Sequence, residues 1–296
     1  MTHATHHRPL NGRVAVVTGA ARGLGAAMAR ELDRRGATVA LLGLEPDRLA
    51  GIAGSLQHDA AWWEADVTDD AAMADTATRV TARLGPASVV IANAGIAEGG
   101  PLAHSDPDTW LRVIEVNLIG SAGTARSFLP SLLTTGGHYL QITSLAAMGT
   151  SPLMSAYRAS KAGPESLAHA LRAELGPEGV GVGIAYINWI DTDMTRDADQ
   201  YAVLREPRAH MPRPARKVYP ADYVAARLAT AVERRRAAVY APAWLRAVQP
   251  VRAYLPPVMT RIARTELPRL ARSAPFEATG MLGAGGRADE DAREGR

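Results

Sequence analysis

Short apolar runs alternate with longer stretches of helical periodicity along most of the chain. Most of the runs are rich in Val, Ile, Leu or Ala, which is typical of a strand buried on both faces of a parallel sheet. The stretches between the runs place apolar residues three and four positions apart, as an amphipathic helix does. The predicted strands are 14–18, 38–42, 60–65, 88–92, 139–143, 180–187 and 237–240. The predicted helices run from a glycine-rich turn to residue 35 and over 47–57, 71–84, 108–133, 156–175 and 221–236.

This alternation predicts an α/β fold: a single Rossmann-like doubly wound parallel sheet with flanking helices and a C-terminal helical extension. The sheet domain is expected over residues 12–241 and the helical extension over 242–282. The polar, His-rich residues 1–11 predict a disordered leader, and the glycine-rich, charged residues 283–296 predict a disordered tail. Several prolines make 196–220 a loop-rich insert.

Residues 244–271 combine an apolar face with a face rich in arginine. A basic amphipathic helix of this kind covers a cleft, contacts another subunit or lies on a membrane surface. A cover over the substrate cleft or a subunit contact is the favoured interpretation. Peripheral membrane contact is the weaker alternative.

Composition narrows the function classes. Apolar content of 47% and charged content of 21% are ordinary for a globular protein. The absence of cysteine excludes disulfides, thiol nucleophiles and Cys-ligated zinc, and is consistent with a cytoplasmic location. His3, His6 and His7 fit a disordered leader better than a metal site, so no metal is predicted. The N-terminus lacks the apolar core of a signal peptide, and no apolar run is long enough to span a membrane. The net charge of +3 has one tight cluster, 234–236, at a predicted helix end, so nucleic-acid binding is not expected.

A glycine-rich turn follows the first predicted strand and opens the first predicted helix. It carries Gly19, Gly23 and Gly25. Glycines let the backbone approach a pyrophosphate, and a helix N-terminus offers N–H donors and a positive dipole end. Because a glycine-rich turn alone is a weak signal, its value depends on what else the chain carries.

Tyr157 and Lys161 are four positions apart in a predicted helix, so they lie on one face. A nearby ammonium lowers the pKa of a phenol, which makes the pair an acid/base unit. Ser144 ends the strand before this helix, at the edge where open α/β sheets bind ligands. A Tyr and a Lys one turn apart can also be an ordinary solvated face. However, of 33 basic residues only Lys161 and Lys217 are lysine, so an ammonium is kept where a compact charge suits the chemistry.

The pattern Thr-Gly-x-x-x-Gly-x-Gly together with Tyr157-x-x-x-Lys161 closely resembles the classical short-chain dehydrogenase/reductase family, from about residue 13 to 240. The resemblance implies oxidation of an alcohol or reduction of a carbonyl with NAD or NADP. Tyr157 would move the proton and Lys161 would lower its pKa and hold the nicotinamide ribose. Ser144 would bind the substrate oxygen, and Asn117, at a local kink in its helix, would complete a proton relay through water.

The resemblance also implies the ligand-binding residues. The expected cofactor-binding residues are Gly19, Ala21, Arg22, Gly23, Leu24, Gly25, Gly43, Leu44, Glu45, Asp66, Val67, Asn93, Ala94, Gly95, Tyr157, Lys161, Asn188, Trp189, Ile190 and Thr192. The expected substrate-binding residues are Ser144, Trp189 and Met194. The insert at 191–220 matches the position of the family's mobile substrate lid.

The cofactor choice depends on three positions. Gly43 stands where the family often has an acid for the ribose hydroxyls of NAD, and Arg22 is available to the 2′-phosphate of NADP. Glu45 could reach a ribose diol or simply begin the next helix. The balance favours NADP slightly.

Asn188-Trp189 replaces the family's Pro-Gly and leaves the orientation of the nicotinamide open. Trp189 and the apolar residues of the insert and extension predict a bulky apolar substrate; packing among themselves or against another subunit is an equal alternative. The resemblance also implies a homo-oligomer, a tetramer or dimer. Two other functions remain open: a redox-neutral epimerase or dehydratase, and a non-catalytic nucleotide-sensing protein.

Overall fold

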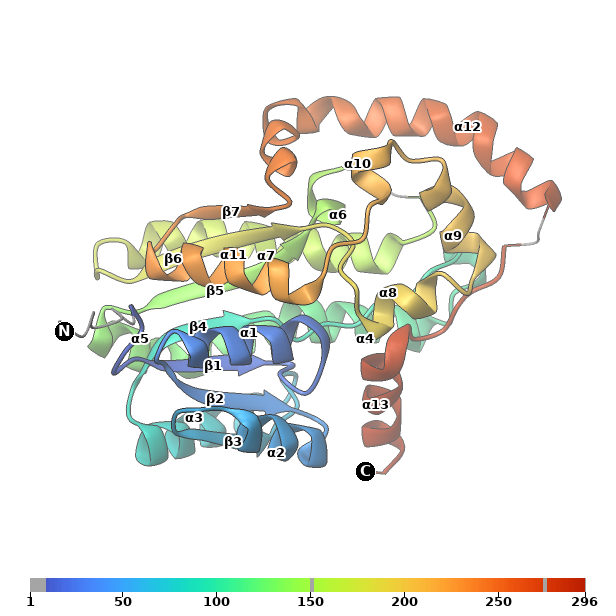
Figure 1. The fold of residues 1–296 in the computed structure, drawn as a ribbon. Coiled ribbons are helices and arrows are strands. Elements are labelled where there is room, and N and C mark those ends of the chain that lie inside the picture. The colour runs from blue at the N-terminus through green and yellow to red at the C-terminus, as the bar shows by residue number, and fades with distance from the viewer. Residues whose placement is uncertain (1–8, 150–151, 274–275, 296) are drawn as a thin grey trace, which may run out of the picture.

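The computed structural model describes residues 9–149, 152–273 and 276–295, and its centre is a seven-stranded parallel sheet (Figure 1). The strand order is β3-β2-β1-β4-β5-β6-β7, with every neighbouring pair parallel. The strands are β1 Val14–Thr18, β2 Thr38–Gly43, β3 Ala60–Glu64, β4 Ala87–Ala92, β5 His138–Ser144, β6 Gly181–Ile187 and β7 Ala238–Ala241. The chain direction across the sheet reverses between β1 and β4, which is where doubly wound sheets bind ligands. The predicted fold class is confirmed.

Helices cover both faces of this sheet (Figure 1). Those that follow the strands are α1 Gly23–Arg34, α2 Pro46–Ser55, α3 Asp70–Leu84, α4 Pro107–Ile114, α5 Gly120–Thr135, α6 Leu145–Met148, α7 Ser155–Leu175 and α11 Ala221–Glu233. The remaining ones are η1 Leu102–His104, η2 Glu115–Ile119, α8 Asp193–Ala198, α9 Ala202–Ala209, α10 Arg213–Arg216, η3 Ala243–Ala247, η4 Gln249–Tyr254, α12 Leu255–Ser273 and α13 Gly283–Glu294.

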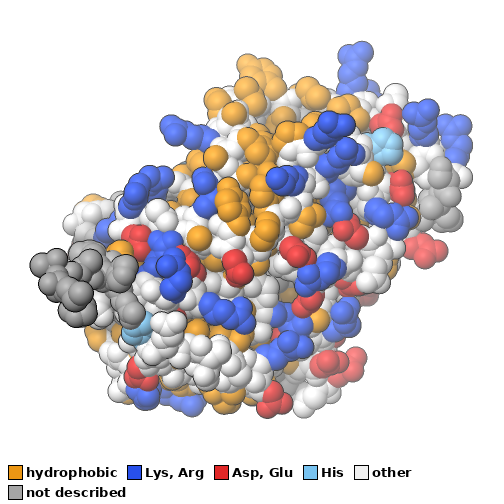
Figure 2. All heavy atoms as spheres, in the orientation of Figure 1, with side chains coloured by type: hydrophobic (Ala, Val, Ile, Leu, Met, Phe, Trp, Pro, Cys, Tyr) orange, Lys and Arg blue, Asp and Glu red, His pale blue; other side chains and the backbone are white. Residues whose placement is uncertain are grey.

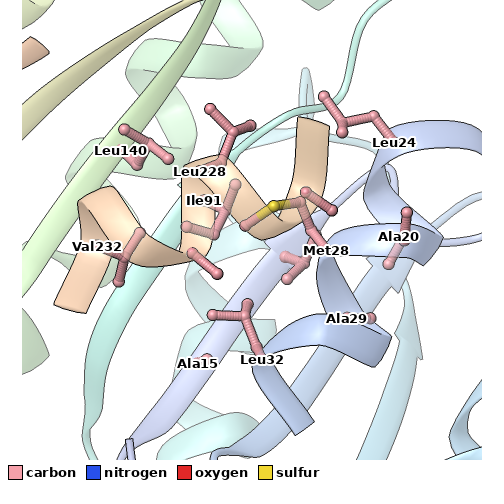
Figure 3. Close-up of a cluster of buried hydrophobic side chains, with 14 of the residues drawn as sticks. Ala15, Ala20, Leu24, Met28, Ala29, Leu32, Ile91, Leu140, Leu228 and Val232 are labelled. Atoms are coloured by element: carbon pink, nitrogen blue, oxygen red, sulfur yellow. The ribbon is translucent and has the colours of Figure 1, made fainter. Parts of the chain in front are cut away.

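Two apolar layers hold the helices to the sheet. In the first, Met28 and Leu32 of α1 pack with Leu228 and Val232 of α11 (Figure 3). The second layer lies on the opposite face, beneath α3, α5 and α7. Alternate residues of β1 feed the two layers, as the pleat of a strand buried on both sides requires. The edge that carries the strands' carboxyl ends is therefore held rigidly.

The predicted helix over 108–133 is interrupted where a kink was expected. One turn of π-helix, η2, joins α4 to α5 and contains Asn117. A π turn widens the helix locally and occurs frequently at functional sites.

The loop-rich insert predicted over 196–220 is instead largely helical, since α8, α9 and α10 lie there. Thr192 caps α8, and Pro212 directly precedes α10. Proline is tolerated at a helix start, where its missing N–H costs nothing.

The ends of the chain also differ from expectation. The predicted disordered tail is wrong for residues 283–294, which form α13. The leader is shorter than predicted, since Leu10 is buried in the core at 3% exposure. Residues 1–8, with the three leader histidines, lie outside the described residues.

Candidate active site

The carboxyl ends of the strands face one cavity of about 640 Å³. Every residue predicted to bind cofactor or substrate lines it, so the structure brings together positions from Gly19 to Met194. Of the predicted catalytic residues, Ser144, Tyr157 and Lys161 line the cavity. Asn117 is fully buried behind it.

The glycine-rich turn has no room for side chains. A Cβ on Gly25 would lie 2.1 Å from the carbonyl oxygen of Gly19, and a Cβ on Gly19, whose φ is +63°, would lie 2.9 Å from Cα of Ala94. No described side chain caps the N-terminus of α1. Its first N–H groups therefore face the cavity as donors for an anion, and the turn fits the pyrophosphate of a dinucleotide.

Arg22, at the start of α1, is held by two carboxylates. Its guanidinium pairs with Glu45, and Nη1 lies 3.1 Å from Oδ2 of Asp193. The hydrogen bond with Glu45 raises the pKa of Arg22. The cation that sequence analysis assigned to a 2′-phosphate is thus already paired.

Asp66, two residues after the end of β3, is bound by Thr68 and Arg112. Oδ1 accepts from the Thr68 backbone N–H at 3.0 Å, and Oδ2 lies 3.0 Å from Nη2 of Arg112. Burial acts to raise the pKa of Asp66, but the Thr68 hydrogen bonds and the Arg112 charge outweigh it and hold the pKa below its usual range. Asp66 is therefore a fixed anionic acceptor at this end of the cavity.

Tyr157 and Lys161 lie together on α7, with Nζ of Lys161 5.7 Å from the centroid of the Tyr157 ring. Burial raises the pKa of Tyr157, and a hydrogen bond with Ser144 offsets this only in part. Burial lowers the pKa of Lys161 to about 8. Burial therefore outweighs the Ser144 hydrogen bond at Tyr157 in this structure, and a lowering of the Tyr157 pKa by Lys161 stays a prediction.

Asn117 is held by hydrogen bonds from its side chain and its backbone. Its side chain accepts from the Ile96 N–H at 2.8 Å and donates to the Ile96 carbonyl at 2.9 Å and to Ser160 Oγ at 2.7 Å. Its own carbonyl accepts from Ser121 Oγ at 2.7 Å. These bonds tie η2 to α7 and to the segment after β4, two elements that line the cavity.

The Asn188-Trp189 pair joins the end of β6 to the insert. Nδ2 of Asn188 donates to the carbonyl of Ala215 at 3.0 Å. The guanidinium of Arg208, on α9, lies 4.9 Å from the centroid of the Trp189 ring. The residues that replace Pro-Gly therefore hold α9 and α10 against the cavity.

Sequence analysis missed part of the cavity wall. Four residues of the C-terminal segment line it: Leu282, Gly285, Ala288 and Asp289. Arg158 also lines it, and was detectable only as the neighbour of Tyr157. The apolar face of α12, including Met259 and Leu267, lines it too, consistent with the predicted cover over the cleft.

Comparison with known proteins identifies the family. The sequence model described as short chain dehydrogenase matches residues 13–202, more than half of the 296-residue chain. Cis-4-hydroxycyclohexanecarboxylate dehydrogenase of Sinomonas cyclohexanicum is 36% identical over 211 residues, which are 68% of this chain and 84% of that protein. The chain belongs to the short-chain dehydrogenase/reductase family and is an oxidoreductase of that family.

Solved structures agree. A short chain dehydrogenase/reductase from Burkholderia phymatum in complex with NAD matches with a TM-score of 0.72 and 26% identity, covering 81% of this chain and 92% of that one. A metagenomic short-chain oxidoreductase in complex with NADP matches with a TM-score of 0.65 and 29% identity, covering 78% of this chain and 97% of that one. Among the described residues, no helix has the length and apolar character to cross a membrane.

Proposed function

We propose that this protein interconverts an alcohol and a carbonyl with NAD(H) or NADP(H). The observation that carries the proposal is that Ser144, Tyr157 and Lys161 line the same cavity as the glycine-rich turn. The cofactor, when bound, supplies or accepts the hydride. Tyr157 passes a proton to or from the substrate oxygen, and the Ser144 hydroxyl orients that oxygen. A screen of alcohols and ketones with both cofactors, followed by nicotinamide absorbance, tests the proposal.

Lys161 and Asn117 have supporting roles in this proposal. With a pKa of about 8, Lys161 can exchange a proton near neutral pH and hold the nicotinamide ribose by its ammonium. Asn117 positions α7 through its bond to Ser160, and its widened π turn is the expected place for a water that relays protons to Lys161.

We infer a preference for NAD(H), against the slight lean towards NADP(H) that the sequence supports. Glu45 and Asp193 both pair with Arg22, and they also pair with Arg48 and Arg196, so Arg22 already has two carboxylate partners where a 2′-phosphate would bind. The Glu45 carboxylate competes with a 2′-phosphate for Arg22, whereas it can accept hydrogen bonds from a ribose diol.

The proposed substrate is bulky and mainly apolar. Figure 2 shows hydrophobic side chains gathered on the upper part of the molecule, where Figure 1 places α10 and α12. Met259, Leu267 and Leu270 of α12 line the cavity together with Trp189. Such walls suit a large apolar group.

Arg158 adds a polar feature to this substrate. Its Nη1 is buried without a hydrogen-bond partner among the described residues, and burial lowers the pKa of Arg158. A buried guanidinium nitrogen without an acceptor is costly, and an anionic group on a ligand in the cavity would supply one. A substrate with an acidic group on an apolar body pairs with Arg158 and packs against the apolar side chains of the cavity. The relative from Sinomonas cyclohexanicum is named for a cyclic carboxylate.

The assembly is expected to be a homo-dimer or tetramer. Leu111 on α4 and Ile119 at the end of η2 are 52% and 51% exposed, on the helices through which the family is expected to pair. A monomeric mass by light scattering at micromolar concentration contradicts this. A cytoplasmic location is proposed from the absence of cysteine, and cell fractionation tests it.

Cofactor turnover distinguishes the two alternative functions from an oxidoreductase. A redox-neutral epimerase or dehydratase turns over substrate without net change in nicotinamide absorbance. A nucleotide-sensing protein binds the cofactor and turns over nothing. The Tyr157–Lys161 pair favours the oxidoreductase over a sensor, because a sensor has no need for an acid/base group.

A further inference from the structure

The chain returns to the cofactor side of the cavity after α12. Residues 276–282 run beside residues 97–100, and the backbone N–H groups of Thr279 and Leu282 donate to the carbonyls of Gly99 and Ala97, each at 2.8 Å. An antiparallel bridge joins Met281 to Glu98. The last segment is thus fastened to the sheet domain before α13 begins.

Helix α13 is anchored at its start and at its middle. At its start, Oδ2 of Asp197 on α8 accepts from the Gly283 N–H at 2.7 Å and lies 3.0 Å from Nη1 of Arg287. Two turns later, Arg112 binds Asp289 through two hydrogen bonds, Nε to Oδ2 at 2.9 Å and Nη2 to Oδ1 at 2.7 Å. Arg112 is 6% exposed and Asp289 is 2% exposed, so this contact is buried. Such paired, charge-assisted bonds are strong.

The inner face of α13 lies towards the cavity. Leu282, Gly285, Ala288 and Asp289 line the cavity together with Glu45 and Asp66. A Cβ on Gly285 would lie 3.8 Å from Cδ of Arg22, so the helix stands directly across from the glycine-rich turn. In Figure 1, α13 stands off the carboxyl ends of β1 and β2. Small residues on this face leave space between the helix and the sheet.

Arg112 connects this helix to the acceptor on the other side of the space. Its Nη2 bonds both Asp289 and Asp66. The same guanidinium therefore fixes Asp66 and holds α13 in place.

We propose that α13 is the outer wall of the adenosine end of the cofactor site, closed by the Arg112–Asp289 pair. The inference rests on the proposed use of a nicotinamide dinucleotide. The adenosine moiety lies between the strand ends and α13, with Gly285 and Ala288 against it. A dinucleotide enters and leaves when α13 moves aside, so the C-terminal helix controls the rate of cofactor exchange.

A larger side chain on the inner face of α13 tests whether this helix forms a wall of the adenosine site. Ala288→Phe places a ring in the adenosine end, whereas Ala292→Phe, one turn further and outside the cavity lining, is the matched control. Isothermal titration with NAD⁺ and with ADP-ribose, which lacks the nicotinamide, measures the effect. We expect Ala288→Phe to weaken both ligands at least tenfold and equally, and Ala292→Phe to leave both within about twofold.

The closing pair is tested by kinetics. Asp289→Asn keeps the shape and removes the charge, and Asp291→Asn makes the same change at an exposed position of α13. Stopped-flow displacement of NADH measures the dissociation rate constant. We expect a rise of about tenfold for Asp289→Asn and no change for Asp291→Asn.

The outcomes separate this inference from the proposed function. If the unaltered protein binds NAD⁺ and ADP-ribose but Ala288→Phe and Asp289→Asn change neither affinity nor rate, the wall is refuted and the proposed function stands. If the unaltered protein binds neither ligand, both fail. Circular dichroism checks that each variant is folded; where Ala288→Phe is not, the Asp289→Asn rate decides.

Discussion

Replacing Glu45 with Gln should change which cofactor the protein prefers. The substitution keeps the size of the side chain and removes one of the two carboxylates that hold Arg22. The surroundings of Arg22 then carry one negative charge fewer. Arg22 becomes available to a 2′-phosphate, while a ribose diol loses its charged acceptor.

The structure sets the size of the effect. Two unit charges 4 Å apart interact by about 4 kcal/mol at an effective dielectric constant of 20. The side chains of Arg22 and Glu45 are 19% and 18% exposed, so solvent reaches them and screens part of this energy. A remaining gain of about 1.4 kcal/mol corresponds to a tenfold change in Kd. We expect NADP⁺ to bind about tenfold more tightly to Glu45→Gln and NAD⁺ to bind about threefold more weakly.

Isothermal titration of both cofactors at two ionic strengths measures these changes. Glu178→Gln, the same change at an exposed position before β6, controls for net charge. Because the effect is electrostatic, the gain for NADP⁺ should shrink at high salt. An unchanged ratio of the two affinities, or tighter binding of NADP⁺ than of NAD⁺ to the unaltered protein, refutes the reasoning.

Four further changes test the site. Tyr157→Phe should lower kcat by about 10²–10⁴ while the cofactor Kd stays within twofold; near-normal turnover excludes Tyr157 as the proton donor. Lys161 loses its proton near pH 8 when folded and near 10.5 when unfolded, so its burial destabilises the protein below pH 8 and this cost fades as the pH rises. Lys161→Met should therefore increase the free energy of unfolding most at pH 7, by up to about 3 kcal/mol, and less at pH 9.5, with a matching rise in Tm. A stability difference that stays the same at both pH values contradicts the lowered pKa of Lys161. Met259→Arg should reduce activity on large apolar substrates, and Thr260→Arg, outside the cavity lining, should not. Equal losses of activity in the two variants would show that α12 has only a structural role. Arg158→Met should raise KM for acidic substrates at least tenfold and leave their neutral analogues unaffected, a split that general loss of packing does not produce.

The sheet and the motif residues could be predicted because their signals are local. Each buried strand is a continuous apolar run, and the glycine-rich turn and the Tyr157–Lys161 pair each fit within a few positions. The insert was misjudged because Pro212 and Pro220 were taken as helix breakers. In the structure they precede α10 and α11, where proline favours a helix start.

The C-terminal helix could not be predicted, because its glycines are required by contacts with residues that are distant in the sequence. Gly283 has a φ of +76°, and a Cβ there would lie 2.7 Å from Cα of Met194, so the position needs glycine for close approach. From the sequence alone the same composition indicates disorder. The Arg112–Asp289 pair joins residues 177 positions apart, and no periodicity relates them.

Helix α12 is fixed at its two ends but buries nothing of its own. None of its residues from 255 to 272 is buried, although its inner face lines the cavity. The sheet on one side and the fastened segment 276–282 on the other keep it in place without a packed core beneath it. Substitutions along α12 therefore alter the shape of the cavity at little cost in folding stability. This makes the helix an exchangeable part, through which relatives of this enzyme could acquire new substrate ranges while the catalytic edge of the sheet stays unchanged.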